Sequence, residues 1–249
     1  WRMSKIYLAV ISILSIIFIN QNEVKELNPI SEVIPDLSIE AQKNLERFYE
    51  LYSKKYGDEK VELTDQENKE LEKLYENYDE TTESVWDIID GGCSWYCGGG
   101  NYKVIASSEL KSMKTFSYDA KKANDLSYET AWVEGKDDSG IGEYLEYHFK
   151  KHSPPVNKIF VSNGYMKTEK SWKNNNRVKK LKLYVNNKPF AILNLKDNRS
   201  SQEFVFDYNW SKGENEDNVL RFEILDIYKG NKYNDTAITE IYFDGTGVH

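Results

Sequence analysis

The segment ANDLSYETAWVEGKDDSGIG, residues 123–142, is the stretch that decides the fold. Its first half is rich in oxygen-bearing side chains, and it continues through Trp132 and a glycine-punctuated turn into residues 143–149, which have the pattern of a strand. Such a loop is held either by a bound hard cation or by the side-chain to backbone hydrogen bonds of Asx and Ser/Thr turns. The segment predicts an ordered loop beside a β-sheet and leaves both means of holding it open.

Length and composition indicate a globular, mainly β protein. The chain has 249 residues, enough for one β domain and a smaller appendage. It contains 18 Tyr and 6 Trp, and aromatic residues favour strands and exposed ring platforms. The formal net charge of -8 argues against a nucleic-acid partner, because binding phosphates needs a basic surface.

The N-terminal residues 1–22 predict a signal peptide or an N-terminal anchor. After Lys5, residues 6–19 form a largely apolar run, too short for a comfortable membrane span but typical of a secretory signal. Asn20, Gln21 and Asn22 are not the small residues that a signal peptidase prefers, so an uncleaved anchor stays open. We expect a secreted, cell-surface or periplasmic protein that contacts a membrane only through this segment.

The chain has two cysteines, Cys93 and Cys97, with glycines on both sides. In an oxidising compartment we expect them to form a disulfide. A redox C-x-x-C motif would be one residue shorter, and a zinc site would need further ligands. Trp95 and Tyr96 lie between the cysteines, either as rim contacts of a site or as a plug under the sandwich.

Residues 23–84 predict a helical region after an irregular lead-in that extends to residue 37. Ser38 is a candidate N-cap for a helix over residues 39–56, which Gly57 ends. Thr64 and Glu67 form a capping box before a second helix, whose narrow apolar stripe predicts little core. We therefore expect a hairpin that leans on the larger domain or serves as a spacer.

From residue 85 to residue 249 the sequence is typical of an all-β domain. Short alternating or β-branched segments lie between Gly, Asn, Asp and Pro clusters. Asn186-Asn187 predicts a two-residue hairpin turn. The eight expected strands, which suit a jelly-roll sandwich, cover residues 102–106, 144–149, 158–162, 178–185, 188–195, 202–207, 219–228 and 237–243.

Several motifs within this domain carry a resemblance to a known family. They are YDAKKANDLSYETAWVEG (118–135), GIGEY (140–144), SNGYMK (162–167), NNNRVKK (174–180), DIYKG (226–230) and ITEI (238–241). The chain resembles the discoidin-type (coagulation factor C-type) glycan-binding domain of bacterial NAD-glycohydrolase toxins. The resemblance implies a galactose-binding-like jelly roll, an extracellular setting and carbohydrate recognition. It does not imply NAD hydrolysis, because the catalytic domain of such toxins is a separate unit.

The resemblance also implies a structural Ca²⁺ ion. Related jelly rolls hold such an ion between an Asn/Asp-rich loop and a glutamate near the C-terminus, and Asp125, Thr130 and Glu240 fall on those positions. Carboxylate and hydroxyl oxygens suit calcium, which would clamp the loop to the last strand. The alternative is a loop that needs no ion because it is fully hydrogen-bonded.

A lectin site needs an aromatic platform beside planar polar groups. For Trp132 we favour a core position, and for the lysines between residues 167 and 182 a solvated face.

No nucleophile or metal partner accompanies His148 or His152, so we expect no catalysis. The expected function is carbohydrate binding, and the rival is a protein-interaction or adhesion module. The candidate glycan-binding residues are Asn163, Tyr165, Trp172, Asn176, Arg177 and Glu134.

Overall fold

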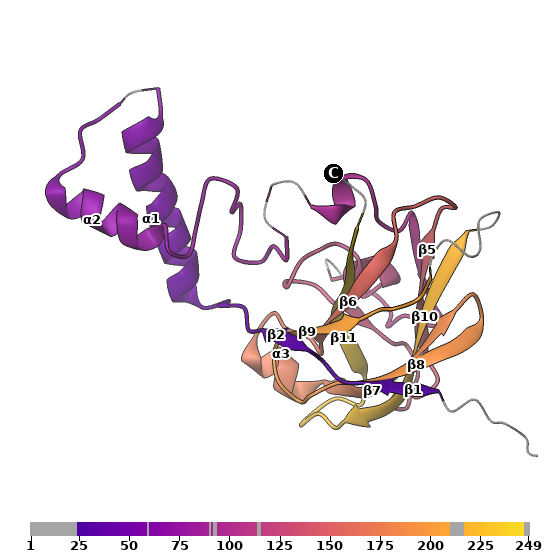
Figure 1. Cartoon of the computed structure of the whole chain (residues 1–249). Coiled ribbons are helices and arrows are strands. Elements are labelled where there is room, and N and C mark those ends of the chain that lie inside the picture. The colour runs from indigo at the N-terminus through magenta and orange to yellow at the C-terminus, as the bar shows by residue number, and fades with distance from the viewer. Residues whose placement is uncertain are drawn as a thin grey trace, which may run out of the picture.

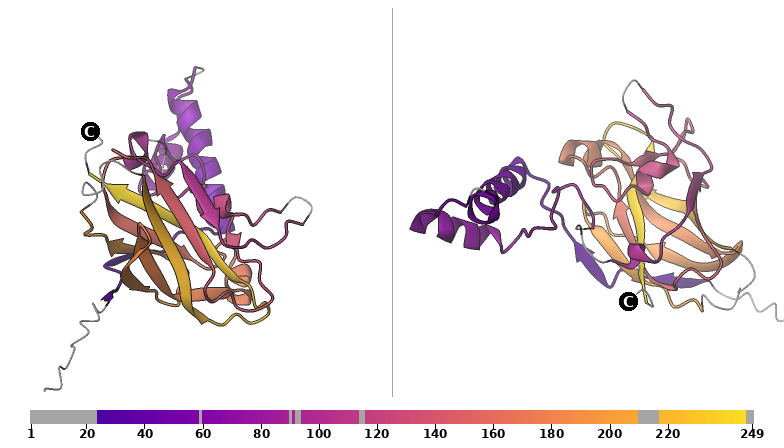
Figure 2. Two further views of the ribbon diagram at one scale, coloured as in Figure 1. Left: turned by 90° about the vertical axis from the view of Figure 1, so that its right-hand side faces the viewer. Right: turned by 90° about the horizontal axis from the view of Figure 1, so that it is seen from above.

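The chain folds into a β-sandwich from which a helical hairpin projects (Figures 1 and 2). The computed structural model describes residues 24–58, 60–89, 91, 94–113, 116–209 and 217–246. The predicted signal or anchor and Cys93, one half of the predicted disulfide, lie outside these residues. No helix in the described ranges is long and apolar enough to cross a membrane.

Two sheets make the sandwich, and a short parallel pairing of β11 with β7 joins them. The other strand pairs are antiparallel, except for the parallel pair of β1 with β8. The first sheet contains β2 (Ser31–Val33), β9 (Ser201–Val205), β6 (Val156–Asn163), β11 (Thr236–Gly245) and β4 (Trp132–Val133). The second contains β1 (Lys25–Leu27), β8 (Lys188–Asn194), β7 (Asn176–Val185), β10 (Asn218–Tyr228), β5 (Tyr144–Phe149) and β3 (Lys103–Ala106). This arrangement confirms the predicted mainly β, jelly-roll class.

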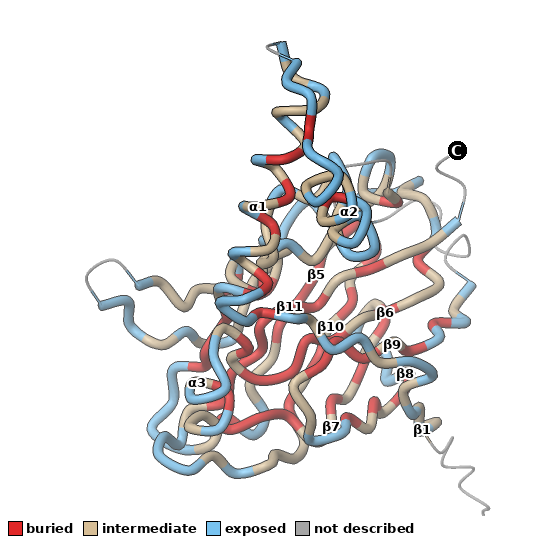
Figure 3. The backbone as a smooth tube through the Cα atoms, turned by 90° about the vertical axis from the view of Figure 1, so that its left-hand side faces the viewer, coloured by how far each residue is buried: buried red, intermediate tan, exposed pale blue. Residues whose placement is uncertain are grey.

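Alternate residues of these strands point between the sheets and form one continuous core, seen as the red part of the tube in Figure 3. The Tyr147 ring packs edge-on against Phe243, with centroids 5.1 Å apart. The Tyr147 hydroxyl donates to the carbonyl of Ala123 at 2.6 Å and so holds the start of the 123–142 loop against the core. Trp132 is fully buried, as predicted, and Trp95 is a buried plug and not a rim contact.

All eight predicted strands are present, with shifted ends, and β5 has the predicted bounds. Asn186 and Asn187 adopt the positive φ angles, 49° and 64°, that the predicted turn requires. The prediction of an irregular lead-in is wrong, because it contains β1 and β2. These strands have three residues each, too few for a visible periodicity. They form by pairing with β8 and β9, an interaction that only the assembled sheets provide.

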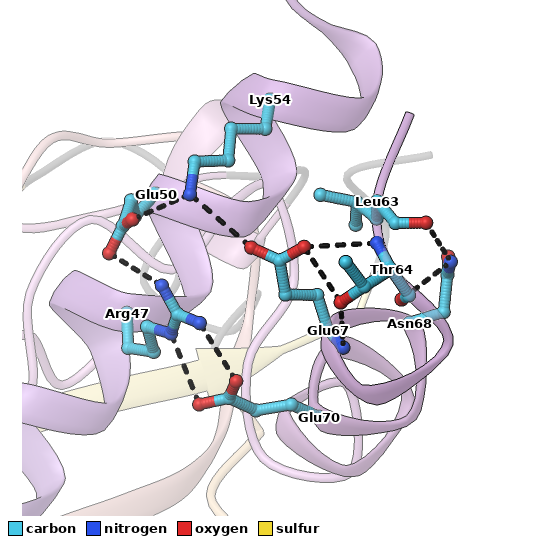
Figure 4. Close-up of polar contacts among 8 residues, drawn as sticks. All are labelled: Arg47, Glu50, Lys54, Leu63, Thr64, Glu67, Asn68 and Glu70. Carbon is cyan, nitrogen blue, oxygen red and sulfur yellow. Dashed lines mark hydrogen bonds and ion pairs between the residues drawn. The ribbon is translucent and has the colours of Figure 1, made fainter. Parts of the chain in front are cut away.

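The hairpin helices agree with the sequence. Helix α1 (Ile39–Tyr56) begins where the Ser38 side chain accepts a hydrogen bond from the backbone of Ala41. Helix α2 (Asp65–Leu74) begins at the Thr64–Glu67 capping box, shown in Figure 4. Their shared core is small, as predicted, and consists of Leu45, Phe48, Leu51, Leu63 and Leu71.

The hairpin meets the sandwich at one small apolar contact. Leu37 and Trp86, from the two legs of the hairpin, pack with the buried side chains of Tyr128, Met166 and Trp172. The backbone of Tyr128 donates to the carbonyl of Trp86 at 2.7 Å. Trp172 belongs to α3 (Glu169–Asn174), a short helix between β6 and β7. The hairpin therefore packs against the sandwich through the apolar cluster that contains Trp172 of α3.

Candidate functional site

A hollow of about 510 Å³ opens at the end of the sandwich beside α3. We call it the tyrosine pocket, because three tyrosines line it. Its walls come from three places: the segment between β3 and η2 (Ala120–Ala123), which we call the arm, helix α3, and the loop before β11. The lining residues are Leu110, Met113, Tyr118, Val133, Tyr165, Thr168, Lys170, Ser171, Asn174, Asn175, Tyr233 and Asp235.

The aromatic part of the pocket is fixed by ring contacts. Tyr118 and Tyr165 lie edge to face, with centroids 6.5 Å apart and an interplanar angle of 86°. Tyr165 is partly buried, and this burial raises the pKa of its phenol, so it stays a neutral donor at physiological pH. Tyr233 is 42% exposed at the rim. The pocket thus offers apolar ring surface and phenolic hydroxyls together.

Helix α3 places polar groups around these rings. The Thr168 hydroxyl accepts a hydrogen bond from the Ser171 backbone at 2.9 Å and caps the helix, which sets the direction of the residues that follow. The backbone carbonyl of Asn174 accepts hydrogen bonds from the backbone amides of Lys232 and Tyr233, at 3.1 and 2.9 Å. These bonds hold the Tyr233 loop against α3, beside Asp235.

The predicted residues Asn163, Trp172 and Arg177 lie behind the pocket as its support. Both ends of the fully buried Asn163 amide bond the backbone of Val178, at 2.7 and 2.9 Å. The Trp172 indole donates to the carbonyl of Asn163 at 2.9 Å. Arg177 stacks 4.6 Å from the Trp172 ring and forms a bidentate pair with Asp197, at 3.0 and 2.8 Å. These polar groups are already engaged within the protein.

Asn176 and Glu134 are also buried and bonded internally. The Asn176 amide donates to the carbonyl of Asn234 and accepts from the Gly230 backbone at 2.8 Å. The Glu134 carboxylate accepts from the backbone of Lys136 at 2.7 Å and of Thr236 at 3.2 Å, and its burial raises its pKa. Of the six residues predicted to contact a glycan, the structure places only Tyr165 on the pocket wall. The other five lie outside its lining and have polar groups bonded within the protein, and their contact with a glycan stays a prediction.

Sequence reasoning missed Tyr118, Tyr233 and Asp235 as wall residues. Tyr118 lies within a quoted motif and Tyr233-Asn-Asp235 is itself a polar, aromatic loop segment. The available signal was therefore the same mixture of tyrosine and Asn/Asp that marked the segment around Tyr165. What hid these residues is that the pocket joins three segments far apart in the chain.

The three residues expected to hold calcium do meet in space. The Glu240 carboxylate, on β11, accepts hydrogen bonds through Oε2 from the backbone of Asp125 at 3.1 Å and of Leu126 at 2.8 Å. The Thr130 hydroxyl lies 2.8 and 2.7 Å from the two carboxylate oxygens of Asp125. The loop is thus clamped to the last strand by hydrogen bonds already present in the structure.

One oxygen of this cluster is left without a partner. Glu240 Oε1 is buried and has no hydrogen-bond partner within the described residues. Burial, and secondarily the charge of Asp125, raise the pKa of Glu240 well above its usual value. A proton or a cation at this position would relieve the unfavourable burial of the charge. The unsatisfied carboxylate oxygen is of the kind that a hard cation prefers. Asp125 is also paired with Lys122 at 3.3 Å, and the described residues contain no group of three or more His, Cys, Asp or Glu that could hold a metal ion.

The domain is thus a two-sheet sandwich with an aromatic pocket at one end. Its family follows from the sequence of the same region: residues 95–244 match the NAD glycohydrolase translocation F5/8 type C domain. Because this match covers more than half of the chain, the protein belongs to that family. A comparison with curated proteins finds no match.

Solved structures with similar folds include two carbohydrate-binding modules. CpGH89CBM32-5 from Clostridium perfringens, in complex with GalNAc-β-1,3-galactose, is 16% identical, with a TM-score of 0.37, and the match covers 57% of this chain and 94% of that one. The family 32 module of C. perfringens NanJ, in complex with galactose, is 15% identical, with a TM-score of 0.36 and coverages of 57% and 91%. For the mycobacterial arabinofuranosyltransferase AftD the identity is 13%, the TM-score 0.42 and the coverages 59% and 10%.

Proposed function

We propose that this chain is an exported carbohydrate-binding protein that holds a glycan in the tyrosine pocket and catalyses no reaction. The observation that carries the proposal is the composition of the pocket: Tyr118, Tyr165 and Tyr233 lie beside the amide of Asn174 and the carboxylate of Asp235. Membership of an F5/8 type C family supports the same reading. The N-terminal segment of the sequence supports export.

The pocket chemistry suits a pyranose. A sugar presents an apolar C–H face that stacks on an aromatic ring, and Tyr233 offers a partly exposed ring at the rim. Neighbouring hydroxyls of the sugar can each donate to Asp235 and accept from Lys170 or Asn174. Because Trp172, Asn163 and Arg177 hold the wall from behind, the site is largely preformed and little ordering entropy opposes binding.

The proposal includes a structural Ca²⁺ ion on the loop of Asp125. Glu240 Oε1, the Asp125 carboxylate and the Thr130 hydroxyl would hold it. The ion would neutralise the negative charge of the buried Glu240 carboxylate. The ion would fix the loop and would take no part in catalysis. Its addition should raise the thermal midpoint of the protein, and EDTA should reverse the rise.

Assays for NAD hydrolysis and for glycoside hydrolysis test the proposal that the chain catalyses no reaction. We expect no release of nicotinamide from NAD and no reducing sugar from oligosaccharides when the purified chain is incubated with either. Turnover that depends on the protein would overturn this part of the proposal and leave the binding site untouched.

Calorimetric titration of the full chain tests the glycan site. The first ligands are galactose and GalNAc-β-1,3-galactose, the sugars held by two of the compared structures. Tyr233→Ala should weaken binding about tenfold, since stacking of one ring contributes on the order of 1–1.5 kcal/mol. The matched control is Tyr56→Ala, which removes a 51% exposed ring from α1 and should leave binding unchanged.

A protein-interaction module is the second candidate, and one observation favours it. Met113 and Phe116, on the arm beside the pocket, are 61% and 55% exposed. Exposed apolar side chains beside a pocket are common at protein interfaces. If a wide glycan array gives no signal while Met113→Ser abolishes capture of a partner protein, this candidate replaces the lectin.

A further inference from the structure

A second groove lies along the free side of β3, the last strand of its sheet. One hollow of about 520 Å³ is lined by β3, the segment before it and the end of η2. A second, of about 680 Å³, shares Val104 and Lys121 with the first, so the two hollows adjoin. We call the two together the β3 groove. None of its lining residues lines the tyrosine pocket.

Three lysines gather at one end of the β3 groove, although the chain carries a net charge of -8. Lys103 and Lys121 are exposed, and neither ammonium group is paired with an acid in the described part of the chain. Lys122 lies 3.3 Å from Asp125. The positive end of the groove therefore holds at least two lysines whose charge is available to a ligand.

The acids of the groove are engaged in holding its walls. The Glu109 carboxylate accepts from the Ala120 backbone at 2.8 Å. The Asp119 carboxylate accepts from the Lys121 backbone at 2.9 Å and from Ser117 at 2.5 Å. Asp125 accepts from Thr130. Glu109 and Asp119 line the other hollow, so the groove has a basic end and a more acidic end.

The basic end also contains an exposed ring and an unpaired amide. Tyr102 is 49% exposed, and its hydroxyl donates to Asp217 at 2.7 Å, which fixes the plane of the ring. Both polar atoms of the Asn101 side chain are buried without a hydrogen-bond partner within the described residues. Asn124 lines the same hollow. A ring, amides and lysines together match a sugar that carries an acidic group.

We propose that the β3 groove is a second glycan site, which binds an acidic oligosaccharide with its carboxylate or sulfate between Lys103 and Lys121 and a sugar face on Tyr102. The hydroxyls of the next sugar units face Ser107, Ser108 and Glu109 in the adjoining hollow. This site adds to the proposed function and does not depend on the tyrosine pocket. The two sites separate by charge: neutral sugars use the pocket and acidic chains use the groove.

The test is a titration of the full chain with a hyaluronan hexasaccharide, a heparin hexasaccharide and the neutral hexa-N-acetylchitohexaose. Hyaluronan carries only carboxylates and heparin also carries sulfates, so the pair distinguishes the two anionic groups. Lys103→Gln combined with Lys121→Gln should weaken binding of the acidic chain by roughly fivefold to tenfold, since each exposed ion pair is worth up to about fivefold. Added salt should weaken binding by the native chain more than by the double variant.

The matched control is Lys43→Gln combined with Lys188→Gln, which removes the same charge from exposed positions on α1 and β8. It should leave binding of both acidic chains unchanged. Equal losses in the two double variants, or no loss in either, would overturn the site, as would hexa-N-acetylchitohexaose binding as tightly as the acidic chains. Galactose binding, measured in parallel with Tyr233→Ala, reports on the tyrosine pocket alone, so failure of one site does not mimic failure of the other.

Discussion

The sandwich buries polar side chains, whereas the helical hairpin buries none among its described residues. In the sandwich, Asn163 and Glu240 are buried and bond the backbone of segments far away in the chain. In the hairpin, the polar pairs lie at the surface, as Arg47 with Glu70 in Figure 4, with distances of 3.1 and 2.9 Å. Buried polar groups are costly to leave unpaired, whereas exposed ion pairs contribute little. Both proposed sites lie on the sandwich, the part that contains the buried polar side chains.

The hairpin is the part that a single core substitution should unfold by itself. Phe48 is fully buried and packs edge-on against Tyr49 and Tyr75, at 5.5 and 5.1 Å. Replacing a buried Phe by Ala removes about 3–5 kcal/mol, which is large for a hairpin with a core this small. Phe48→Ala should lower the helical signal in far-UV circular dichroism and leave glycan binding in place.

Tyr56→Ala is the control, because that ring is largely exposed. It should change the helical signal little. A loss of glycan binding in Phe48→Ala would break the comparison, since it would show that hairpin and sandwich order as one unit through the apolar cluster that includes Trp86 and Trp172.

Asn163→Ala should show the opposite distribution, with the sandwich damaged and the hairpin intact. The variant leaves the N–H and the carbonyl of Val178 buried without partners, at a combined cost of about 3 kcal/mol. Denaturant unfolding followed by tryptophan fluorescence measures the loss. Asn194→Ala removes an exposed amide that donates to Glu26 and should cost less than about 0.5 kcal/mol. Equal losses in the two variants would remove the distinction between buried and exposed amides.

Glu240 links the stability of the sandwich to pH. Its pKa in the folded chain is raised above the ordinary value of 4.5, so without calcium the folded state binds the proton more tightly than the unfolded state. The stabilisation is complete below about pH 4.5 and is lost as the pH rises toward the folded-state pKa. Calcium, by favouring the carboxylate, should remove this loss.

Thermal unfolding in EDTA and in calcium measures this effect. In EDTA, Glu240→Gln should flatten the pH profile and raise stability at pH 7 by about 1–3 kcal/mol, because a neutral amide replaces a carboxylate whose charge is costly to bury. In calcium the same variant should lose the rise in midpoint that the native chain shows. A native chain with no pH dependence in EDTA, or with no response to calcium, would argue for a self-bonded loop.

The same contrast explains how much the sequence could predict. Helix α1, the capping box of α2 and the Asn186-Asn187 turn follow from signals a few residues apart, and the structure has all three. The class of fold followed from the repeated strand pattern. Strands β1 and β2 exist only by pairing with β8 and β9, and no local pattern announces them.

The sequence indicated which segments lie near the pocket but not which of their side chains line it. Residues 162–167 and 174–177 do form the region of the tyrosine pocket, yet Asn163 and Arg177 face inward. A loop sequence rich in Asn and Arg is equally suited to contacting a sugar and to bonding buried backbone. Only the position of β7 and of Asp197, far along the chain, decides which occurs. Tyr118 and Tyr233 became wall residues for the same long-range reason.

The smallest expected effects come from the two threonine caps, one in each region. Thr64→Ala removes the hydroxyl that accepts from the Glu67 backbone at 3.2 Å, and Thr168→Ala removes its counterpart at the start of α3. Each loss should be about 1 kcal/mol.

Because α2 has one buried side chain, Leu71, while α3 is held by Trp172, we expect Thr64→Ala to fray its helix without changing sugar affinity. Thr168→Ala should instead weaken sugar binding severalfold with little change in helical signal, because α3 forms part of the tyrosine pocket. If both variants left sugar affinity unchanged, the cap of α3 would have no part in shaping the pocket.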